Sequence, residues 1–248
     1  MTWSIVARDP ESNALGVTVA SRFFAVGALV PHIKTGVGAI ATQAFVNPHY
    51  GIQGLERLAE GAAPLDIIES LTTADEGRDS RQLHMINAMG DNAAFTGRNC
   101  VDWAGHLVGD QVSVAGNMLA GPQVVAATME SYQAHSELPF LERLLTAMEA
   151  GEAAGGDKRG RQSATIKIYR GEAYPWLDLR ADDHADPLKE LRRLYAVAQE
   201  RYLHFAEAMP SAQNPSGVAD RSDLDRKLLE LEAERRRTGT ASASFANP

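Results

Sequence analysis

Thr2 is the first residue whose type and position could do chemistry. It follows the initiator methionine directly and heads the short apolar run of residues 3–7. A small residue in this position allows Met1 to be removed, which would leave threonine at the N-terminus. An α-amino group has a pKa of about 7.7–8.0, so its neutral fraction can accept the proton of the adjacent hydroxyl. Thr2 is therefore predicted to be a nucleophile that carries its own base; the alternative is an ordinary strand residue behind a retained Met1.

The densest polar motif is Gly-Gly-Asp-Lys-Arg-Gly-Arg-Gln-Ser at residues 155–163, directly before a predicted strand. Glycines let the backbone approach a ligand closely, and guanidinium groups bind carboxylates or phosphates through two parallel hydrogen bonds. We therefore predict that Asp157, Arg159 and Arg161 bind substrate. The alternative is a helix C-cap followed by a solvated charged loop.

Further polar residues stand at the ends of predicted strands. Asn117 and Gln43 each carry a side-chain amide that could donate to a developing oxyanion, and Ser21 could hydrogen-bond the N-terminal amine. With Thr2, we assign Ser21 and Asn117 to catalysis; Gln43, Arg22 and Asn47 join the predicted substrate-binding residues. Stabilisation of turns, or a buried serine satisfied by backbone groups, is the alternative reading of these positions.

No metal site or cofactor is predicted. The cluster of Asp182, Asp183 and His184 precedes Asp186-Pro187, which is explained as the start of a helix. The other histidines are scattered along the chain without the close spacing of a zinc site.

Composition limits the partners. The chain of 248 residues has 24 basic and 32 acidic residues, and its formal charge of −8 repels phosphate backbones, so we expect no nucleic acid to bind. No run of 18 apolar residues occurs, and the N-terminal residues have no basic region followed by an apolar run, so we expect neither a signal peptide nor membrane association. The single cysteine, Cys100, cannot form a disulfide within the chain and is expected to be a small buried apolar residue; this favours a cytoplasmic location.

Strands and helices alternate in blocks that should position these residues. Period-two patterns predict strands at residues 3–7, 15–21, 25–30, 37–44, 82–88, 93–96, 112–115, 164–169 and 176–179. Helical spacing predicts helices near residues 52–59, 65–71, 124–129, 141–148 and 188–198. Strand blocks that alternate with antiparallel helix pairs argue against a doubly wound sheet. We predict an α/β (α+β) fold, a four-layer α/β/β/α sandwich of two largely antiparallel sheets.

The same reading divides the chain into four parts. Residues 1–210 form the sandwich domain, and residues 211–221, rich in Ser, Pro, Asn and Gly, form a linker. Residues 222–236 form a charged helix, and residues 237–248 are expected to be disordered. One stripe of leucines on that helix could join a homodimer or a higher homo-oligomer, or dock onto its own domain.

Several motifs in order resemble a known family. They are Ser-Ile-Val-Ala-Arg-Asp-Pro at residues 4–10, Leu-Gly-Val-Thr-Val-Ala-Ser-Arg at 15–22, Gly-Val-Gly-Ala-Ile-Ala-Thr-Gln-Ala at 36–44, Ala-Gly-Asn-Met-Leu at 115–119 and the motif from Gly155. Over residues 2 to about 200 the chain is similar to the domain of unknown function family 1028. The resemblance implies the α/β/β/α fold of proteasome subunits and other N-terminal nucleophile (Ntn) hydrolases, and it implies no substrate.

Two functions follow as expectations. The first is an Ntn-type hydrolase that cleaves an amide bond in a small or peptide-like substrate bearing a carboxylate. The second is a non-catalytic ligand-binding or scaffolding protein on the same fold. Proteasome-like chains usually end their second strand with Asp-Ser-Arg, and Ala20 stands here in place of the Asp, which keeps the second expectation open. A third alternative is catalysis by Ser21 or another internal group.

Overall fold

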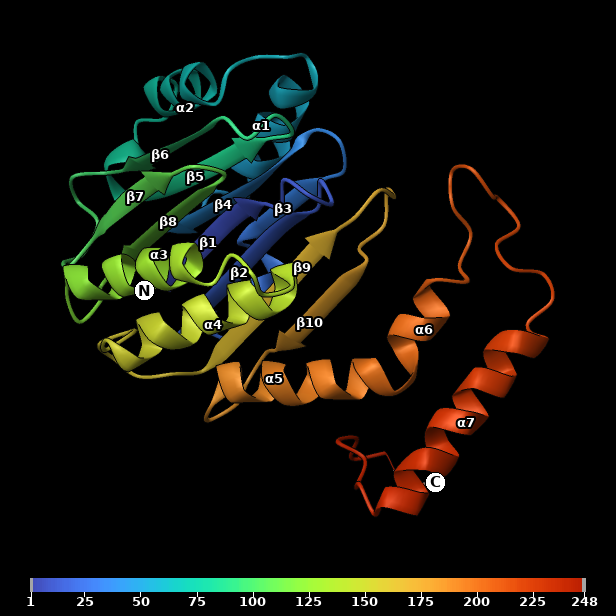
Figure 1. Cartoon of the computed structure of the whole chain (residues 1–248). Coiled ribbons are helices and arrows are strands. Elements are labelled where there is room, and N and C mark those ends of the chain that lie inside the picture. The colour runs from blue at the N-terminus through green and yellow to red at the C-terminus, as the bar shows by residue number, and fades with distance from the viewer. Residues whose placement is uncertain (1, 247–248) are drawn as a thin grey trace. The chain divides into compact units, whose positions relative to one another are not determined.

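The chain folds into two units, described here from a computed structural model of residues 2–246 (Figure 1). The first unit ends at Leu188 and the second begins at Lys189, so the division falls before the predicted boundary near Pro210. Met1 and the last two residues lie outside the described part of the chain. None of the helices in residues 2–246 is long and apolar enough to cross a membrane.

The first unit contains a six-stranded sheet in the order β10-β9-β2-β1-β8-β7, in which every neighbouring pair is antiparallel. Its strands are β1 (Thr2–Arg8), β2 (Leu15–Ser21), β7 (Gly105–Gly109), β8 (Val112–Asn117), β9 (Ser163–Tyr169) and β10 (Leu177–Ala181). β1 lies in the interior of this sheet, and its residues from Thr2 to Ala7 are all buried. A strand with both faces covered reads as a nearly continuous apolar run, as residues 3–7 do.

A four-stranded antiparallel sheet in the order β3-β4-β5-β6 packs against the first. Its strands are β3 (Pro31–Lys34), β4 (Gly38–Ala44), β5 (Arg81–Asn87) and β6 (Asn92–Thr96). Val6, Val17 and Val19 from the larger sheet meet Ala41 and Ile86 from the smaller one in a buried cluster. Burial of these apolar side chains between the sheets drives their association.

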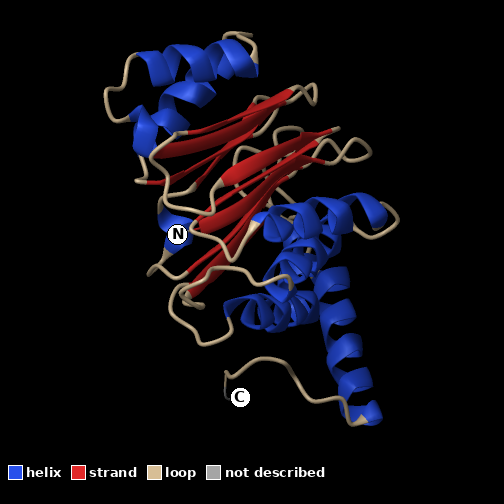
Figure 2. Cartoon of the chain, turned by 90° about the vertical axis from the view of Figure 1, so that its left-hand side faces the viewer, coloured by secondary structure: helices blue, strands red, loops and turns tan. Residues whose placement is uncertain are grey.

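Helices cover the outer faces of both sheets and complete four layers (Figure 2). Helices α1 (Pro48–Ala59) and α2 (Pro64–Thr73) contact the smaller sheet, and α3 (Pro122–Ala134) and α4 (Phe140–Ala153) contact the larger one. Proline stands in the first turn of α1, α2 and α3, where its missing N–H costs nothing. The predicted four-layer sandwich of two antiparallel sheets is confirmed.

One predicted strand is wrong. Residues 25–30 form no strand; a 3₁₀ turn, η1 (Val26–Ala28), occupies this segment, and strand β3 begins only at Pro31. Ala25 has a φ of 51°, in the left-handed region, and this reverses the chain after β2. The Val26 backbone N–H donates to the Ser163 hydroxyl at 3.1 Å, so the turn is tied to β9. Short apolar runs do not distinguish a buried turn from a strand.

The second unit is helical. It holds most of α5 (Pro187–Val197), a π-helical turn (Ala198–Tyr202), α6 (Leu203–Ala206) and α7 (Ser222–Thr238). Helix α7 contacts α6 and the π-helical turn of its own chain. Within the segment expected to be disordered, Ala243 donates its backbone N–H to Glu200 at 2.7 Å and accepts from Arg193 at 2.6 Å. Residues 247–248 of that segment lie outside the described residues.

Candidate active site

The register of the larger sheet assembles the predicted catalytic residues around the first residue of β1. Trp3 pairs with Ala20, and Thr2 pairs with Asn117, so Thr2 lies between the ends of β2 and β8. The hydroxyls of Thr2 and Ser21 are 3.1 Å apart and share a hydrogen bond. The structure therefore brings Thr2, Ser21 and Asn117 together, although they are far apart in the sequence.

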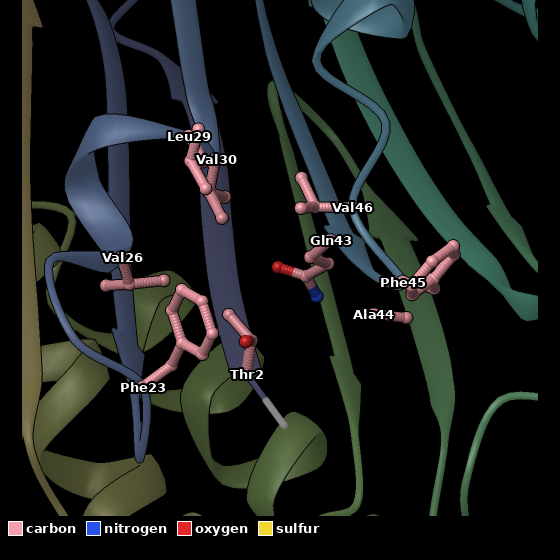
Figure 3. A pocket seen from close by; sticks show the side chains of 9 residues that line it. All are labelled: Thr2, Phe23, Val26, Leu29, Val30, Gln43, Ala44, Phe45 and Val46. Atoms are coloured by element: carbon pink, nitrogen blue, oxygen red, sulfur yellow. The ribbon is translucent and has the colours of Figure 1, made fainter.

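A cavity of about 220 Å³ opens beside Thr2 (Figure 3). Its walls come from the end of β1, from the segment between β2 and β3 and from the end of β4. The lining residues are Thr2, Phe23, Val26, Leu29, Val30, Gln43, Ala44, Phe45 and Val46. None of these side chains carries a charge, and only two are polar. The Thr2 hydroxyl thus stands at the edge of an apolar cavity of the size that binds a small organic group.

Two side-chain amides lie next to Thr2, and both are held by the protein. Asn117 donates its Nδ2 to the Thr2 carbonyl at 3.4 Å and to Gln82 Oε1 at 3.0 Å. Gln43 donates its Nε2 to the same Gln82 oxygen at 2.8 Å and to the Ala115 carbonyl at 3.1 Å. A primary amide has two N–H groups, so both residues use their full donor capacity here. Donation to an oxyanion, predicted for both, would require one of these hydrogen bonds to open.

A chain of buried hydrogen bonds through Ser4, His84 and Ser113 holds the Gln43 side-chain amide in place. The Ser4 hydroxyl donates to Gln43 Oε1 at 2.7 Å and lies 2.7 Å from His84 Nε2. Because a hydroxyl has one proton, His84 must donate from Nε2, and its Nδ1 then accepts from Ser113 at 2.7 Å. Burial, with a smaller contribution from His106, lowers the pKa of His84 to about 3, so the ring is neutral at pH 7.

Comparison with known proteins assigns the chain to a family through residues that span the first unit. Residues 2–191 match the model of a family of unknown function, DUF1028. The chain belongs to this family. A crystal structure of a DUF1028 protein from Silicibacter pomeroyi shares 33% identity with it, covering 88% of this chain and 96% of that one, with a TM-score of 0.82. An Anbu (ancestral beta-subunit) structure from Yersinia bercovieri shares 12% identity over 78% of this chain and 92% of its own, with a TM-score of 0.40. No curated protein matches the chain.

Three predicted substrate-binding residues of the DUF1028 domain, Arg22, Asp157 and Arg159, are hydrogen-bonded to one another. They do not line the Thr2 cavity. The buried Asp157 carboxylate accepts the backbone N–H groups of Arg22 and Arg159, each at 2.8 Å. The Arg22 guanidinium donates to the Arg159 carbonyl at 3.0 Å. Because Arg22 follows Ser21 directly, these bonds fix the glycine-rich loop against the end of β2, and with it the Ser21 hydroxyl that faces Thr2.

Two other predicted residues have structural partners elsewhere in the DUF1028 domain. Arg161 forms ion pairs with Glu152 and, at 3.3 Å, with Asp186. The Asn47 side chain accepts the backbone N–H of His49 at 3.1 Å and so caps helix α1. Neither Arg161 nor Asn47 lines the Thr2 cavity. Among residues 2–246, no group of three or more His, Cys, Asp or Glu side chains could hold a metal ion.

Sequence reasoning missed the apolar walls of the site and a second cavity. This second cavity, of about 490 Å³, is lined by Ala44, Phe45, Ser80, Asn99, Cys100, Val101, Asn117 and Met118. Phe45 and Ala44 border both cavities, and the Phe45 side chain is 72% exposed. Cys100 is half-buried, and burial raises the pKa of its thiol, so it is a weak nucleophile at pH 7. The pair Phe23-Phe24, directly after the polar end of β2, was the available signal for an apolar rim.

Proposed function

We propose that this DUF1028 protein is an Ntn-type hydrolase that cleaves an amide bond, with Thr2 as the nucleophile. The observation that carries the proposal is the Thr2 hydroxyl, which is 3.1 Å from Ser21 and lines a cavity at the head of a buried central strand. A hydroxyl in that place can reach a carbonyl carbon bound in the cavity, and the rigid strand fixes its position.

In the proposed reaction, the α-amine exposed by loss of Met1 takes the proton from the Thr2 hydroxyl as its oxygen attacks the carbonyl carbon. The amine then gives this proton to the leaving nitrogen as the C–N bond breaks, and an ester on Thr2 remains. Water, activated by the same amine, hydrolyses the ester and releases a carboxylic acid. The Ser21 hydroxyl, hydrogen-bonded to the Thr2 hydroxyl at 3.1 Å, would fix the Thr2 hydroxyl for this transfer.

A backbone N–H is the best-placed group for stabilising the oxyanion, since the two nearby side-chain amides already have acceptors. Thr42 donates its backbone N–H to Val30, on the β3 side of β4, at 3.2 Å. Alternation along a strand directs the Ala44 N–H to the same side, which is the side of the Thr2 cavity. Ala44 then leaves the strand with a φ of 69°. We assign the Ala44 N–H as oxyanion donor; loss of one such donor typically costs 10²–10³-fold in kcat.

The structure gives little support to the expectation that the substrate carries a carboxylate. Arg161 is paired with two carboxylates, Arg159 lies against Asp157, and no basic residue lines the Thr2 cavity. The proposed reaction therefore uses no anchored carboxylate. The single cysteine, a half-buried thiol, supports the further proposal that the protein works in the cytoplasm.

The test is hydrolysis of a set of chromogenic amides by the wild type, Thr2→Ala and Thr2→Ser. We expect Thr2→Ser to retain activity and Thr2→Ala to lose it by about 10³-fold or more. Equal thermal unfolding temperatures for the two variants would serve as the folding control. Activity of Thr2→Ala equal to that of the wild type would refute the nucleophile.

A ligand-binding protein without catalysis is the second candidate, favoured by the full commitment of the Asn117 and Gln43 amides to protein acceptors. Under this alternative the Thr2 cavity still binds an uncharged ligand, and the wild type hydrolyses none of the amides. Binding of an amide by both the wild type and Thr2→Ala, with no turnover by either, would favour it.

A further inference from the structure

Apolar side chains form both the walls and the mouth of the Thr2 cavity. Inside, Val26 and Val30 are buried, and at the mouth Phe23, Leu29 and Phe45 are exposed by 51%, 37% and 72%. Figure 3 shows Phe23 and Leu29 on one side of Thr2 and Phe45 on the other. Large apolar side chains left exposed around a concavity mark a binding surface.

The side chains that line this cavity provide no charge to pair with a charged occupant. The two polar groups that line it are the Thr2 hydroxyl and the Gln43 amide, whose N–H groups already have acceptors. A carboxylate that entered would lose much of its water shell and meet no cation among the lining side chains. The Thr2 α-amine must be neutral to act as the base, so it gives no compensating charge in the reacting form, and burial of the carboxylate is unfavourable.

The size of the cavity fits a branched or aromatic group. An apolar cavity of about 150 Å³ is enough to hold benzene. The Thr2 cavity, at about 220 Å³, has room for a group as large as the side chain of leucine or phenylalanine.

We propose that the acyl part of the substrate carries a bulky, uncharged, apolar group that enters the cavity lined by Phe23, Val26, Leu29 and Val30. This inference rests on the proposed function, and it replaces a carboxylate-bearing substrate with an apolar one. Each methylene group buried on the way to the transition state should raise the rate of acylation about fourfold. An isobutyl group, with three more carbons, should therefore react about 60-fold faster than a methyl group, and a carboxymethyl group more slowly than methyl.

The experiment uses three β-lactones that differ only in this substituent: methyl, isobutyl and carboxymethyl. Ring opening by the Thr2 hydroxyl forms an ester and leaves the alkoxide of the lactone to take the proton, so the adduct mass equals that of the whole lactone. We expect second-order rates in the order isobutyl, methyl, carboxymethyl. Carboxymethyl at least as fast as isobutyl would overturn the inference.

A charge placed at the mouth of the cavity should change this order. In Leu29→Lys the ammonium group can pair with a carboxylate, so the isobutyl to carboxymethyl ratio should fall by at least tenfold. Leu65→Lys is the matched control, because Leu65 is exposed on α2 and lines neither cavity. An equal ratio in both variants would show that the substituent does not enter the Thr2 cavity, and it would contradict the inference.

A binding measurement separates this inference from the proposed function. Titration calorimetry on Thr2→Ala with amides bearing the same three substituents needs no nucleophile. If no lactone labels Thr2 and the isobutyl amide still binds most tightly, the hydrolase proposal fails and the apolar ligand stands. Tightest binding of the carboxymethyl amide would overturn the inference whatever Thr2 does.

Discussion

His84, on β5 of the smaller sheet, hydrogen-bonds to Ser4 and Ser113 of the larger sheet and so tests how the two sheets are held together. Its ring is fully buried, donates to Ser4 and accepts from Ser113, and has a pKa lowered to about 3 by burial. In the unfolded chain the pKa of a histidine is about 6.5. Between these two values the unfolded state binds a proton that the folded state does not bind. The free energy of unfolding should therefore fall as the pH falls from 6.5 towards 3.

The size of this effect follows from the two pKa values. Each pH unit below 6.5 costs up to about 1.4 kcal/mol, so lowering the pH from 7 to 4.5 should cost about 2.5 kcal/mol from His84 alone. His32 and His106 also have pKa values lowered by burial and add to the same slope. The hydrogen bond from Tyr50 holds the pKa of Asp75 at about 2, so the stability that Asp75 contributes is lost only below about pH 4, outside this range. The difference between the wild type and a His84 variant isolates the contribution of His84.

The assay is urea denaturation of the wild type and His84→Gln at pH 7, 6, 5.5 and 4.5. His84→Gln should be less stable at pH 7, because glutamine is shorter and cannot bridge the two serines. Its stability should nevertheless fall by about 2.5 kcal/mol less than that of the wild type over this range. His106→Gln, a histidine less deeply buried, serves as the control and should reduce the slope less. Equal slopes for the wild type and His84→Gln would refute a neutral, buried imidazole.

Three further predictions concern the residues around the site. Tyr50→Phe removes the hydroxyl that donates to Asp75 at 2.7 Å, so urea denaturation should show a loss of about 1 kcal/mol, and no loss would contradict the bond. Gly116→Ala would place a Cβ 2.4 Å from the Leu119 side chain; calorimetric melting should show a loss of about 1–3 kcal/mol, and an unchanged melting temperature would show that the sheet relaxes freely. Arg161→Met should leave the rate of acylation by β-lactones within twofold of the wild type, because Arg161 pairs with Glu152 and Asp186; a larger fall would restore it to the substrate site.

The fold could be predicted from the sequence because its strands bury at least one face. Residues 15–21 are apolar at nearly every position and form β2 with the predicted bounds. The sequence does not predict strand β7 (Gly105–Gly109), because His106 is only partly buried, Leu107 and Val108 are exposed, and the segment shows no alternation. The turn at Val26 was predicted as a strand because a left-handed φ at an alanine leaves no trace in the sequence.

The sequence predicts which polar residues gather at Thr2 better than it predicts the apolar walls of the cavity. Thr2, Ser21 and Asn117 stand at strand ends, and adjacent antiparallel strands bring their ends together. The glycine-rich loop was placed near the site, but its charges were expected to face a ligand. Instead Asp157 binds backbone N–H groups of its own chain. Which charges of a loop are paired internally depends on tertiary contacts that local patterns do not contain.

The central claim is that Thr2 is an N-terminal nucleophile. Peptide mass mapping of the full-length protein, before and after reaction with the isobutyl β-lactone, tests it most directly. We predict an N-terminal peptide that begins at Thr2, with a free amine before the reaction and a single acyl group on Thr2 afterwards. A retained Met1, or an adduct confined to any other residue, would contradict the account.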